Sequence, residues 1–256
     1  MNSLMALLMG DKSALVTKEK ALPGRASKME VPEKHFVTGN TMEQPFPSNL
    51  EHCVFGSGCF WGSEKAAWRM PGVWSSSVGY AGGFTPNPTY EEVCSGQTGH
   101  TEVYQVVWDP EIVGFADILR IFWQSHDPTQ GMRQGNDSGT QYRSALFPAT
   151  PEQHKLVLAS KEAYQGALSK AGFGAITTEI GEPGATEYYF AEGYHQQYLA
   201  KPGSRPYCSA QPTGVAMPEY AGGECKLPEK YFEKYGPRPG CTIGFPNEQV
   251  QMDELK

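Results

Sequence analysis

The feature that most constrains this chain is a cysteine set between glycines and aromatic residues, directly after a short apolar run. The sequence reads Gly58-Cys59-Phe60-Trp61-Gly62, preceded by Cys53-Val54-Phe55 and followed by the helix-forming segment 63–69. This order predicts a strand, a tight turn and a helix start. Because a helix N-terminus stabilises an anion, we expect the thiol of Cys59 to have a lowered pKa and to act as a nucleophile.

Cys59 also has a less reactive interpretation. Free cysteines are among the most buried residue types, and most behave as small hydrophobic residues. The flanking glycines and the adjacent Phe60 and Trp61 favour instead an accessible thiol beside an apolar wall. The glycine spacing does not match the G-x-G-x-x-G loop of dinucleotide-binding proteins.

Composition narrows the function classes. A net charge of -7 over 256 residues argues against a nucleic-acid-binding surface. No uninterrupted apolar run approaches the roughly 18 residues of a membrane helix. The cysteines have no zinc-ligand spacing, and a long chain without a convincing signal peptide does not suggest a secreted disulfide framework. We therefore expect no metal, no cofactor, no nucleic acid and no membrane partner. The six cysteines are Cys53, Cys59, Cys94, Cys208, Cys225 and Cys241.

Three regions follow one another along the chain. Residues 1–50 are polar and broken by prolines, and we interpret them as an N-terminal arm or leader. Residues 51–200 alternate between predicted strands and helices and form the expected catalytic domain. From residue 201 to 256 glycine and proline dominate, which predicts a coiled C-terminal tail.

Periodicity in the central region predicts an α+β domain, with an antiparallel or mixed sheet and helices on one face. Two segments, 84–100 and 130–140, are expected to be loops. Strands are predicted at 51–55, 73–80, 102–108, 141–147, 176–180 and 187–190, the last two paired with each other. Helices are predicted at 63–70, 115–125, 151–171 and 194–200.

Several blocks together resemble the A-type methionine sulfoxide reductases, the peptide-methionine (S)-S-oxide reductases. The resemblance covers roughly residues 51–215 and implies a two-layer α+β sandwich with a ferredoxin-like βαββαβ core and a long coiled C-terminal extension. The blocks are Gly58-Cys59-Phe60-Trp61-Gly62, Val78-Gly79-Tyr80-Ala81-Gly82-Gly83, Asn87-Pro88-Thr89-Tyr90, Thr98-Gly99-His100-Thr101-Glu102, His126-Asp127-Pro128-Thr129-Gln130, Gly135-Asn136-Asp137 with Gly139-Thr140-Gln141-Tyr142-Arg143-Ser144, and Tyr194-His195-Gln196-Gln197-Tyr198-Leu199.

The resemblance implies a thiol-dependent reduction of methionine (S)-S-oxide, free or in proteins, as a repair of oxidative damage. A sulfoxide oxygen leaves only when protonated, so the chemistry needs a nucleophilic thiol, an acid and fixed hydroxyl donors. The implied roles are Cys59 as nucleophile, Glu102 as acid, Tyr80 and Tyr142 as hydroxyl donors, Asp127 as an ordering residue, and Phe60 and Trp61 as the wall that holds the substrate methyl group.

The resemblance also implies how the enzyme is recycled. The sulfenic acid left on Cys59 would be resolved by Cys208, and thioredoxin would reduce the Cys59–Cys208 disulfide. The third recycling cysteine of many relatives has no counterpart near Gly214-Val215, so Cys225 or Cys241 remains open for that role. Cys53 and Cys94 are interpreted as structural.

Two other functions stay open from the residues alone. One is a cysteine hydrolase in which Cys59 works with His100 or His195. The other is a redox-responsive binding protein in which Cys59 senses oxidant. We expect a monomer in the cytoplasm, with a plastid or other organelle as the alternative if residues 1–50 act as a leader.

Overall fold

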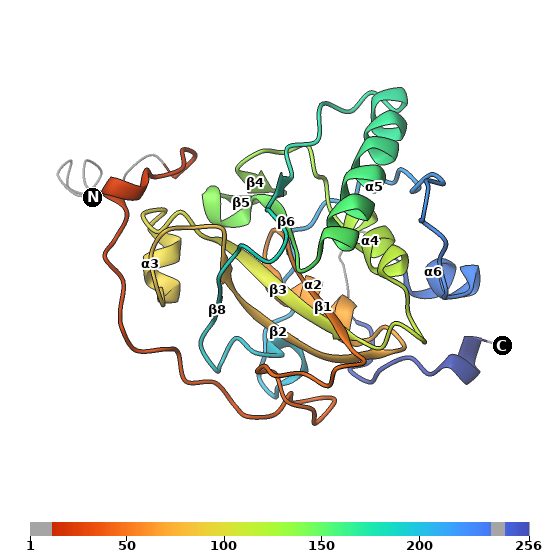
Figure 1. Cartoon of the computed structure of the whole chain (residues 1–256), viewed down its shortest axis with the longest axis horizontal. Coiled ribbons are helices and arrows are strands. Elements are labelled where there is room, and N and C mark those ends of the chain that lie inside the picture. Colours follow the sequence, from red (N-terminus) through yellow and green to blue (C-terminus); the bar gives the residue numbers. More distant parts are fainter. Residues whose placement is uncertain (1–11, 237–243, 256) are drawn as a thin grey trace.

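A six-stranded sheet forms the centre of the computed structural model, which describes residues 12–236 and 244–255 (Figure 1). The strand order is β7-β6-β1-β3-β2-β8, and the pairs are antiparallel except for β6 with β7. The strands are β1 (Glu51–Ser57), β2 (Val73–Ala81), β3 (Thr101–Trp108), β6 (Ser144–Pro148), β7 (Glu179–Ile180) and β8 (Tyr188–Phe190).

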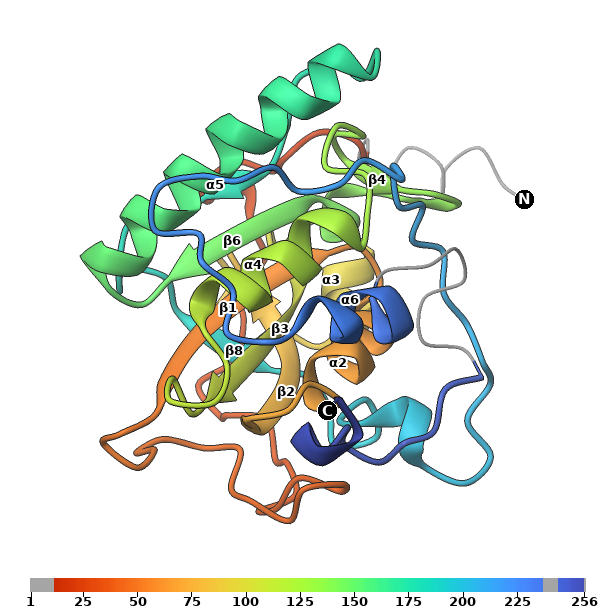
Figure 2. The same ribbon diagram turned by 90° about the vertical axis from the view of Figure 1, so that its right-hand side faces the viewer.

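Helices α2 (Phe60–Trp68) and α4 (Phe115–Gln124) lie on one face of this sheet, where Figure 2 shows them in front of the strands. Helix α2 connects β1 to β2, and α4 lies between β3 and β6. The antiparallel order β6-β1-β3-β2 is that of a ferredoxin-like βαββαβ unit, so the predicted α+β core is confirmed. Helix α5 (Pro151–Lys170) packs beside α4 and β6.

The helical layer is held by large apolar side chains. In α4, Leu119 and Phe122 are fully buried, and Phe122 packs against Phe55 of β1 at a ring separation of 5.6 Å. Trp108 of β3 stacks on Phe115 at 5.6 Å. Each such side chain contributes roughly 2–3 kcal/mol when it is removed from water, which fixes the helices to the sheet that carries the site.

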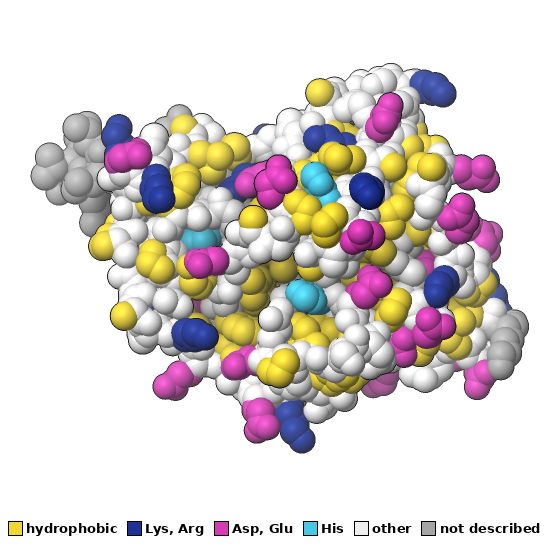
Figure 3. All heavy atoms as spheres, viewed as in Figure 1, with side chains coloured by type: hydrophobic (Ala, Val, Ile, Leu, Met, Phe, Trp, Pro, Cys, Tyr) yellow, Lys and Arg dark blue, Asp and Glu magenta, His cyan; other side chains and the backbone are white. Residues whose placement is uncertain are grey.

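The opposite face of the sheet has a smaller apolar cluster. It comprises Val54, Ala81, Val103, Ala145 and Phe147, with Tyr188 packed against it. A groove at this face is lined partly by Val54 and Phe147. Figure 3 shows hydrophobic side chains around a hollow on the side of the molecule that is viewed as in Figure 1.

The arm before β1 lies against the domain that contains the sheet. Its described part, 12–50, contains the 3₁₀ turn η1 (Lys18–Lys20) and an isolated bridge between Lys34 and Thr41. The Leu22 N–H donates to the carbonyl of Gln97 at 3.0 Å. The described arm is therefore bound to the domain through backbone hydrogen bonds.

The predicted pairing of 176–180 with 187–190 is wrong, because β7 and β8 lie on opposite edges of the sheet. Glycine at position 79 explains where β8 lies. A Cβ atom on Gly79 would come within 2.3 Å of the Tyr189 carbonyl oxygen and 2.7 Å of the Tyr188 ring. The missing side chain thus lets β8 approach β2, and the Tyr188 hydroxyl bonds to Ser77 Oγ at 2.8 Å.

Short elements occupy several segments expected to be irregular. Helix α3 (Tyr90–Cys94) lies within 84–100 and begins with a capping box between Thr89 and Glu92. The segment 130–140 contains the hairpin of β4 (Arg133–Gln134) and β5 (Asp137–Ser138), followed by η2 (Thr140–Tyr142). Within 194–200 only η3 (Tyr198–Ala200) is helical, so the predicted helix there is shorter than expected.

The tail after residue 201 is mostly coil but returns to the core. Helix α6 (Glu229–Tyr235) follows a segment whose Lys226 and Leu227 N–H groups both donate to the buried Asp117 carboxylate at 3.0 Å. Farther along, Lys65 Nζ of α2 donates to the Phe245 carbonyl at 2.8 Å. The described chain ends with the 3₁₀ turn η4 (Met252–Leu255).

Candidate active site

Cys59 lies at the N-cap of α2, and only Gly58 separates it from the end of β1. The turn before it needs glycine, because Gly58 has a φ of 92° and a Cβ there would come within 2.7 Å of the Gln134 side chain. Helix α2 starts at Phe60, three residues earlier than the predicted start at 63. Cys59 is a free thiol and is only partly exposed.

Glu102, on β3, is 2% exposed and reaches the start of the same helix. Its Oε2 accepts the Phe60 N–H at 3.1 Å. Burial raises the pKa of Glu102 to about 8, against the lowering effect of that hydrogen bond, and Asp137 adds to the rise. At neutral pH the carboxyl therefore carries a proton beside the residue that follows Cys59, as an acid in this site must.

The expectation of a lowered pKa for Cys59 is wrong. Burial of the thiol raises its pKa well above the usual value, and Glu102 and Asp137 raise it further. The N–H of Trp61 lowers it, which is the helix-end effect that the sequence indicates, but this effect is smaller than desolvation. The Cys59 thiol and the Glu102 carboxyl group are thus both protonated at neutral pH when no substrate is bound.

The structure separates the two tyrosines proposed as hydroxyl donors. Tyr142 is partly exposed, and burial together with Glu102 raises the pKa of its phenol. Tyr80 is 0% exposed, and its hydroxyl donates to Glu192 Oε2 at 3.0 Å. The Tyr80 proton is therefore directed to another carboxylate, and this geometry does not support Tyr80 as the donor to a substrate oxygen.

Tyr90 is a second phenol whose surroundings suit a hydroxyl donor. It is partly exposed at the start of α3. Burial raises the pKa of its phenol, and the charges of Glu102 and Cys59 add to the rise, so the phenol lies within electrostatic range of the acid and the nucleophile. The signal that could have identified it is the block Asn87-Pro88-Thr89-Tyr90, which belongs to the resemblance but was not used for the site.

Asp127 likewise has another task. Its Oδ1 accepts the Thr129 N–H at 2.9 Å and the Thr129 hydroxyl at 2.7 Å, so it orders the turn after α4. Asp137 of β5, in contrast, raises the pKa of both Glu102 and Cys59. The carboxylate that acts electrostatically on the site is therefore Asp137, from the Gly135-Asn136-Asp137 block.

Phe60 and Trp61 form an aromatic wall at the start of α2. Phe60 is buried, with its ring 6.5 Å from that of Trp61. Trp61 Nε1 donates to His195 Nδ1 at 3.1 Å, and its ring stacks on Tyr198 at 4.1 Å. The wall is thus fixed by the segment that follows β8.

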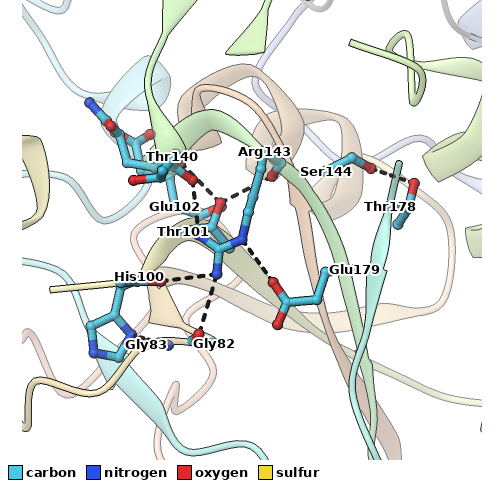
Figure 4. A network of polar contacts seen from close by, with 12 residues as sticks. Gly82, Gly83, His100, Thr101, Glu102, Thr140, Arg143, Ser144, Thr178 and Glu179 are labelled. Atoms are coloured by element: carbon cyan, nitrogen blue, oxygen red, sulfur yellow. Dashed lines mark hydrogen bonds and ion pairs between the residues drawn. The ribbon is translucent and has the colours of Figure 1, made fainter. Parts of the chain in front are cut away.

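Arg143 joins η2 to the turns that follow β2 and precede β3, and Figure 4 shows this network. The guanidinium is buried and forms an ion pair with Glu179 at 2.7 Å. It also donates to three backbone carbonyls, those of Thr140 at 2.9 Å, Gly99 at 3.0 Å and Gly82 at 3.3 Å. A single buried cation therefore satisfies carbonyls from three turns around the site.

The tail passes over the β4–β5 hairpin next to the site. The hydroxyl of Tyr207 donates to Asp137 Oδ1 at 2.5 Å, and the hydroxyl of Ser209 donates to Oδ2 of the same carboxylate. Cys208 lies between these two residues and is disulfide-bonded. Because Cys59 is free, the structure does not contain the predicted Cys59–Cys208 bond, which stays a prediction for the oxidised enzyme.

The other cysteines differ in surroundings. Cys53 is buried and its thiol contacts the Phe147 carbonyl at 3.3 Å, while Cys94 is hydrogen-bonded to the Tyr90 phenol. Cys225 is an exposed free thiol. Cys241 lies outside the described residues.

The histidines give no support to a cysteine hydrolase. His100 Nδ1 accepts the Gly83 N–H at 3.0 Å, and its Nε2 pairs with the Thr85 carbonyl at 2.7 Å. His195 uses Nδ1 to accept from Trp61. Among the described residues there is no group of three or more His, Cys, Asp or Glu side chains that could hold a metal ion. The described helices include none that is both long and apolar enough to span a membrane.

Comparison with known proteins gives the same result as the geometry. A family model described as peptide methionine sulfoxide reductase matches residues 51–219. The peptide methionine sulfoxide reductase MsrA 1 of a Synechocystis species is 56% identical over 211 residues, which is 82% of this chain and 94% of that protein. MsrA of Pseudomonas syringae pv. tomato is 56% identical over 216 residues, 84% of this chain and 99% of that protein.

Solved structures agree with this match. Methionine sulfoxide reductase A of Corynebacterium diphtheriae has a TM-score of 0.71 at 46% identity and covers 80% of this chain and 100% of that one. Reduced Mxr1 of Saccharomyces cerevisiae has a TM-score of 0.56 at 31% identity, and the match covers 69% of this chain and 96% of that one. The fold and the thiol–carboxyl site define a cysteine-dependent oxidoreductase. The chain belongs to the peptide methionine sulfoxide reductase family.

Proposed function

We propose that this enzyme reduces the S epimer of methionine sulfoxide, free or in proteins, with Cys59 as nucleophile and Glu102 as acid. The observation that supports this most directly is the protonated, buried Glu102, bonded to the N–H that follows Cys59. The aromatic wall of Phe60 and Trp61 supplies an apolar surface for the methyl group on the sulfur. Tyr90 and Tyr142 are the candidate hydroxyl donors to the sulfoxide oxygen.

The chemistry balances without a cofactor. Glu102 protonates the sulfoxide oxygen while the Cys59 sulfur attacks the sulfoxide sulfur, and the thiol proton returns to the carboxylate. The oxygen is then transferred to Cys59, which becomes a sulfenic acid, and methionine leaves. The substrate sulfur is reduced by two electrons and the cysteine sulfur is oxidised by two.

Recycling completes the proposal. A Cys208 thiol attacks the Cys59 sulfenic acid, releases water and forms the Cys59–Cys208 disulfide, which thioredoxin then reduces by thiol–disulfide exchange. The position of Cys208 between Tyr207 and Ser209, both bonded to Asp137, supports this role. Cys208 must first be released from the disulfide that it forms in this structure. We further propose that the enzyme works as a monomer in the cytoplasm.

A test with separated epimers decides the proposal. With dithiothreitol as reductant, the wild-type enzyme should convert only methionine (S)-S-oxide to methionine, measured by chromatography of the products. Cys59→Ser should abolish conversion. Turnover of both epimers at equal rates, or retained activity in Cys59→Ser, would contradict it.

The recycling step is tested with Cys208→Ser. This variant should form one equivalent of methionine per enzyme in a single turnover and then stall in an assay with thioredoxin, thioredoxin reductase and NADPH. Cys225→Ser changes an exposed free thiol and tests in parallel whether that cysteine has the recycling role left open by the sequence. Normal cycling of Cys208→Ser would assign the resolving role to another cysteine.

A further inference from the structure

The carboxyl group of Glu64 is buried in α2 and has no part in the proposed chemistry. Glu64 is 0% exposed and lies three residues after Trp61, so both side chains project from the same region of the helix. A buried carboxyl group is costly unless hydrogen bonds compensate for its lost hydration. The position of these bonds indicates what the residue does.

Glu64 is held by three hydrogen bonds, two of them from one residue. Gln197 donates its backbone N–H to Oε2 at 2.9 Å and its side-chain amide to Oε1 at 2.7 Å. Ser76 Oγ donates to Oε1 at 3.1 Å. Gln197 has left-handed backbone angles, with φ of 46°, which is uncommon for a residue other than glycine. The contact with Glu64 thus stabilises a strained backbone position.

Residues on both sides of this strained position contact Trp61: His195, two residues before it, and Tyr198, directly after it. On one side, His195 accepts the Trp61 indole N–H at 3.1 Å. On the other, Tyr198 stacks on the indole ring with 4.1 Å between ring centroids. Glu64 therefore ties α2 to the segment that orients the tryptophan on the same helix. Movement of Gln197 would shift both contacts of the indole.

The N-terminal arm closes this network from the other side. His35 Nδ1 accepts the backbone N–H groups of Val37 and Thr38, each at 3.1 Å, so its Nε2 carries the hydrogen. Nε2 donates to Ser76 Oγ at 2.9 Å, which leaves the Ser76 hydroxyl hydrogen directed at Glu64. The Phe36 N–H also donates to Gln197 Oε1 at 3.1 Å. The arm thus orders both donors to Glu64.

We propose that Glu64 is a positioning residue that sets the shape of the methyl-binding wall, by holding Gln197 and through it the two residues that fix Trp61, with His35 of the arm completing the network. The inference rests on the proposed function, because it assumes that the wall receives the methyl group of methionine sulfoxide. Glu64 acts through Gln197 and does not itself touch the substrate.

Glu64→Gln tests the proposal with two substrates. The substituted amide brings an NH₂ group against the donors of Gln197, so the segment should shift while the packed volume stays the same. We expect the KM for methionine (S)-S-oxide to rise about tenfold, since small displacements of a binding group have large kinetic effects. The preference for the methyl sulfoxide over its S-ethyl homologue, ethionine (S)-S-oxide, should fall at least about threefold, because one methylene is what such a pocket discriminates.

Asp117→Asn is the matched control. Asp117 is also a fully buried carboxyl group with three backbone N–H partners, those of Gly114, Lys226 and Leu227, but it joins α4 to the tail. This variant should lose stability while its KM and methyl preference remain those of the wild type. A mere folding defect lowers the active fraction equally for both substrates and leaves their ratio unchanged.

The outcomes are separable from those of the proposed function. Wild-type enzyme that reduces neither sulfoxide would refute the function. An active wild type, with wild-type KM and methyl preference in Glu64→Gln, would refute only the positioning role. If Glu64→Gln does not fold, Ser76→Ala removes one of the three bonds, and an unchanged ratio in that variant overturns the proposal in the same way.

Discussion

Two buried carboxyl groups lie at helix α2 and differ in their hydrogen bonds: Glu64 belongs to the helix, and Glu102 of β3 is bonded to its first turn. Among the described residues, Glu102 accepts one bond, from the Phe60 N–H. Glu64 accepts three, from Gln197 and Ser76. Burial raises the pKa of both groups, that of Glu102 to about 8 and that of Glu64 to about 7.

The difference shows how one helix can use a carboxyl group in two ways. A buried carboxylate with several donors is compensated and can hold structure, whereas one with a single donor is neutralised more readily by a proton. Glu102 therefore keeps a transferable proton beside Cys59. The donors around Glu64 instead fix the distance between α2 and the segment after β8.

Of the variants that test this comparison, Glu102→Gln should change the reaction rate most. The glutamine can still accept the Phe60 N–H but cannot deliver a proton, so single-turnover formation of methionine should slow about 1,000-fold. Glu64→Gln should slow the same step far less, because its carboxyl group is not the acid. Rapid-quench measurement of methionine at saturating substrate separates the two variants.

The pH dependence of the reaction rate should also distinguish Glu102 from Glu64. Because the protonated form of Glu102 is the acid, the wild-type rate should fall as pH rises through about 8. In Glu64→Gln the fall should occur at the same pH. A rate that is flat from pH 6 to 9, or a Glu102→Gln variant within about tenfold of the wild type, would assign the acid role to another group.

The sequence predicts the long elements, misses short ones such as α6, and predicts strand β8 but not its place in the sheet. Strand β3 and helix α4 are recognised by periodicity because each has enough residues to show a pattern. Strand β8 has three residues, and its place depends on the space left by Gly79. Helix α6 follows a segment held by Asp117, more than a hundred residues earlier in the chain. Such contacts leave no local periodic signal.

The same limit applies to the site. Cys59 and Glu102 are found from motifs, but the raised pKa of Cys59 follows from burial, which a helix-start pattern does not reveal. Tyr80 of β2 is the cross-strand partner of Glu102 on β3, so the sequence prediction chose a tyrosine that does lie near the acid. The direction of its hydroxyl is set by Glu192, which comes much later in the chain.

The two tyrosines sharpen the role of the acid. The Tyr90 phenol is bonded to the thiol of Cys94, a weak acceptor, from which it can turn to a substrate oxygen. Tyr90→Phe should therefore reduce the single-turnover rate about 100-fold, the typical effect of losing one donor to a developing negative charge. Tyr80→Phe should lose little activity. The reverse order of the two rates would restore Tyr80 as the donor.

Substitution of the two carboxyl groups should change thermal stability less than it changes activity. The two variants should shift the melting temperature in opposite directions. The pKa of Glu102 is raised in the folded state from an ordinary value of 4.5 to about 8, so the folded enzyme binds more protons than the unfolded chain between these values. The free energy of unfolding then falls as pH rises across this window, and full stability is present only below about 4.5. Glu102→Gln removes this loss. Its melting temperature should equal that of the wild type near pH 4.5 and exceed it by about 10 °C at pH 8.

Glu64→Gln should behave in the opposite way, although the pKa of Glu64 is also raised. The wild-type carboxyl group satisfies three buried donors, and an amide in its place satisfies fewer. In differential scanning calorimetry the variant should therefore melt below the wild type near pH 4.5. This deficit should narrow as pH rises through about 7, because the wild type loses stability as Glu64 ionises. If Glu102→Gln is instead destabilised at pH 8, the ionisation of buried Glu102 does not cost the wild type stability. The distinction between the two carboxyl groups then fails.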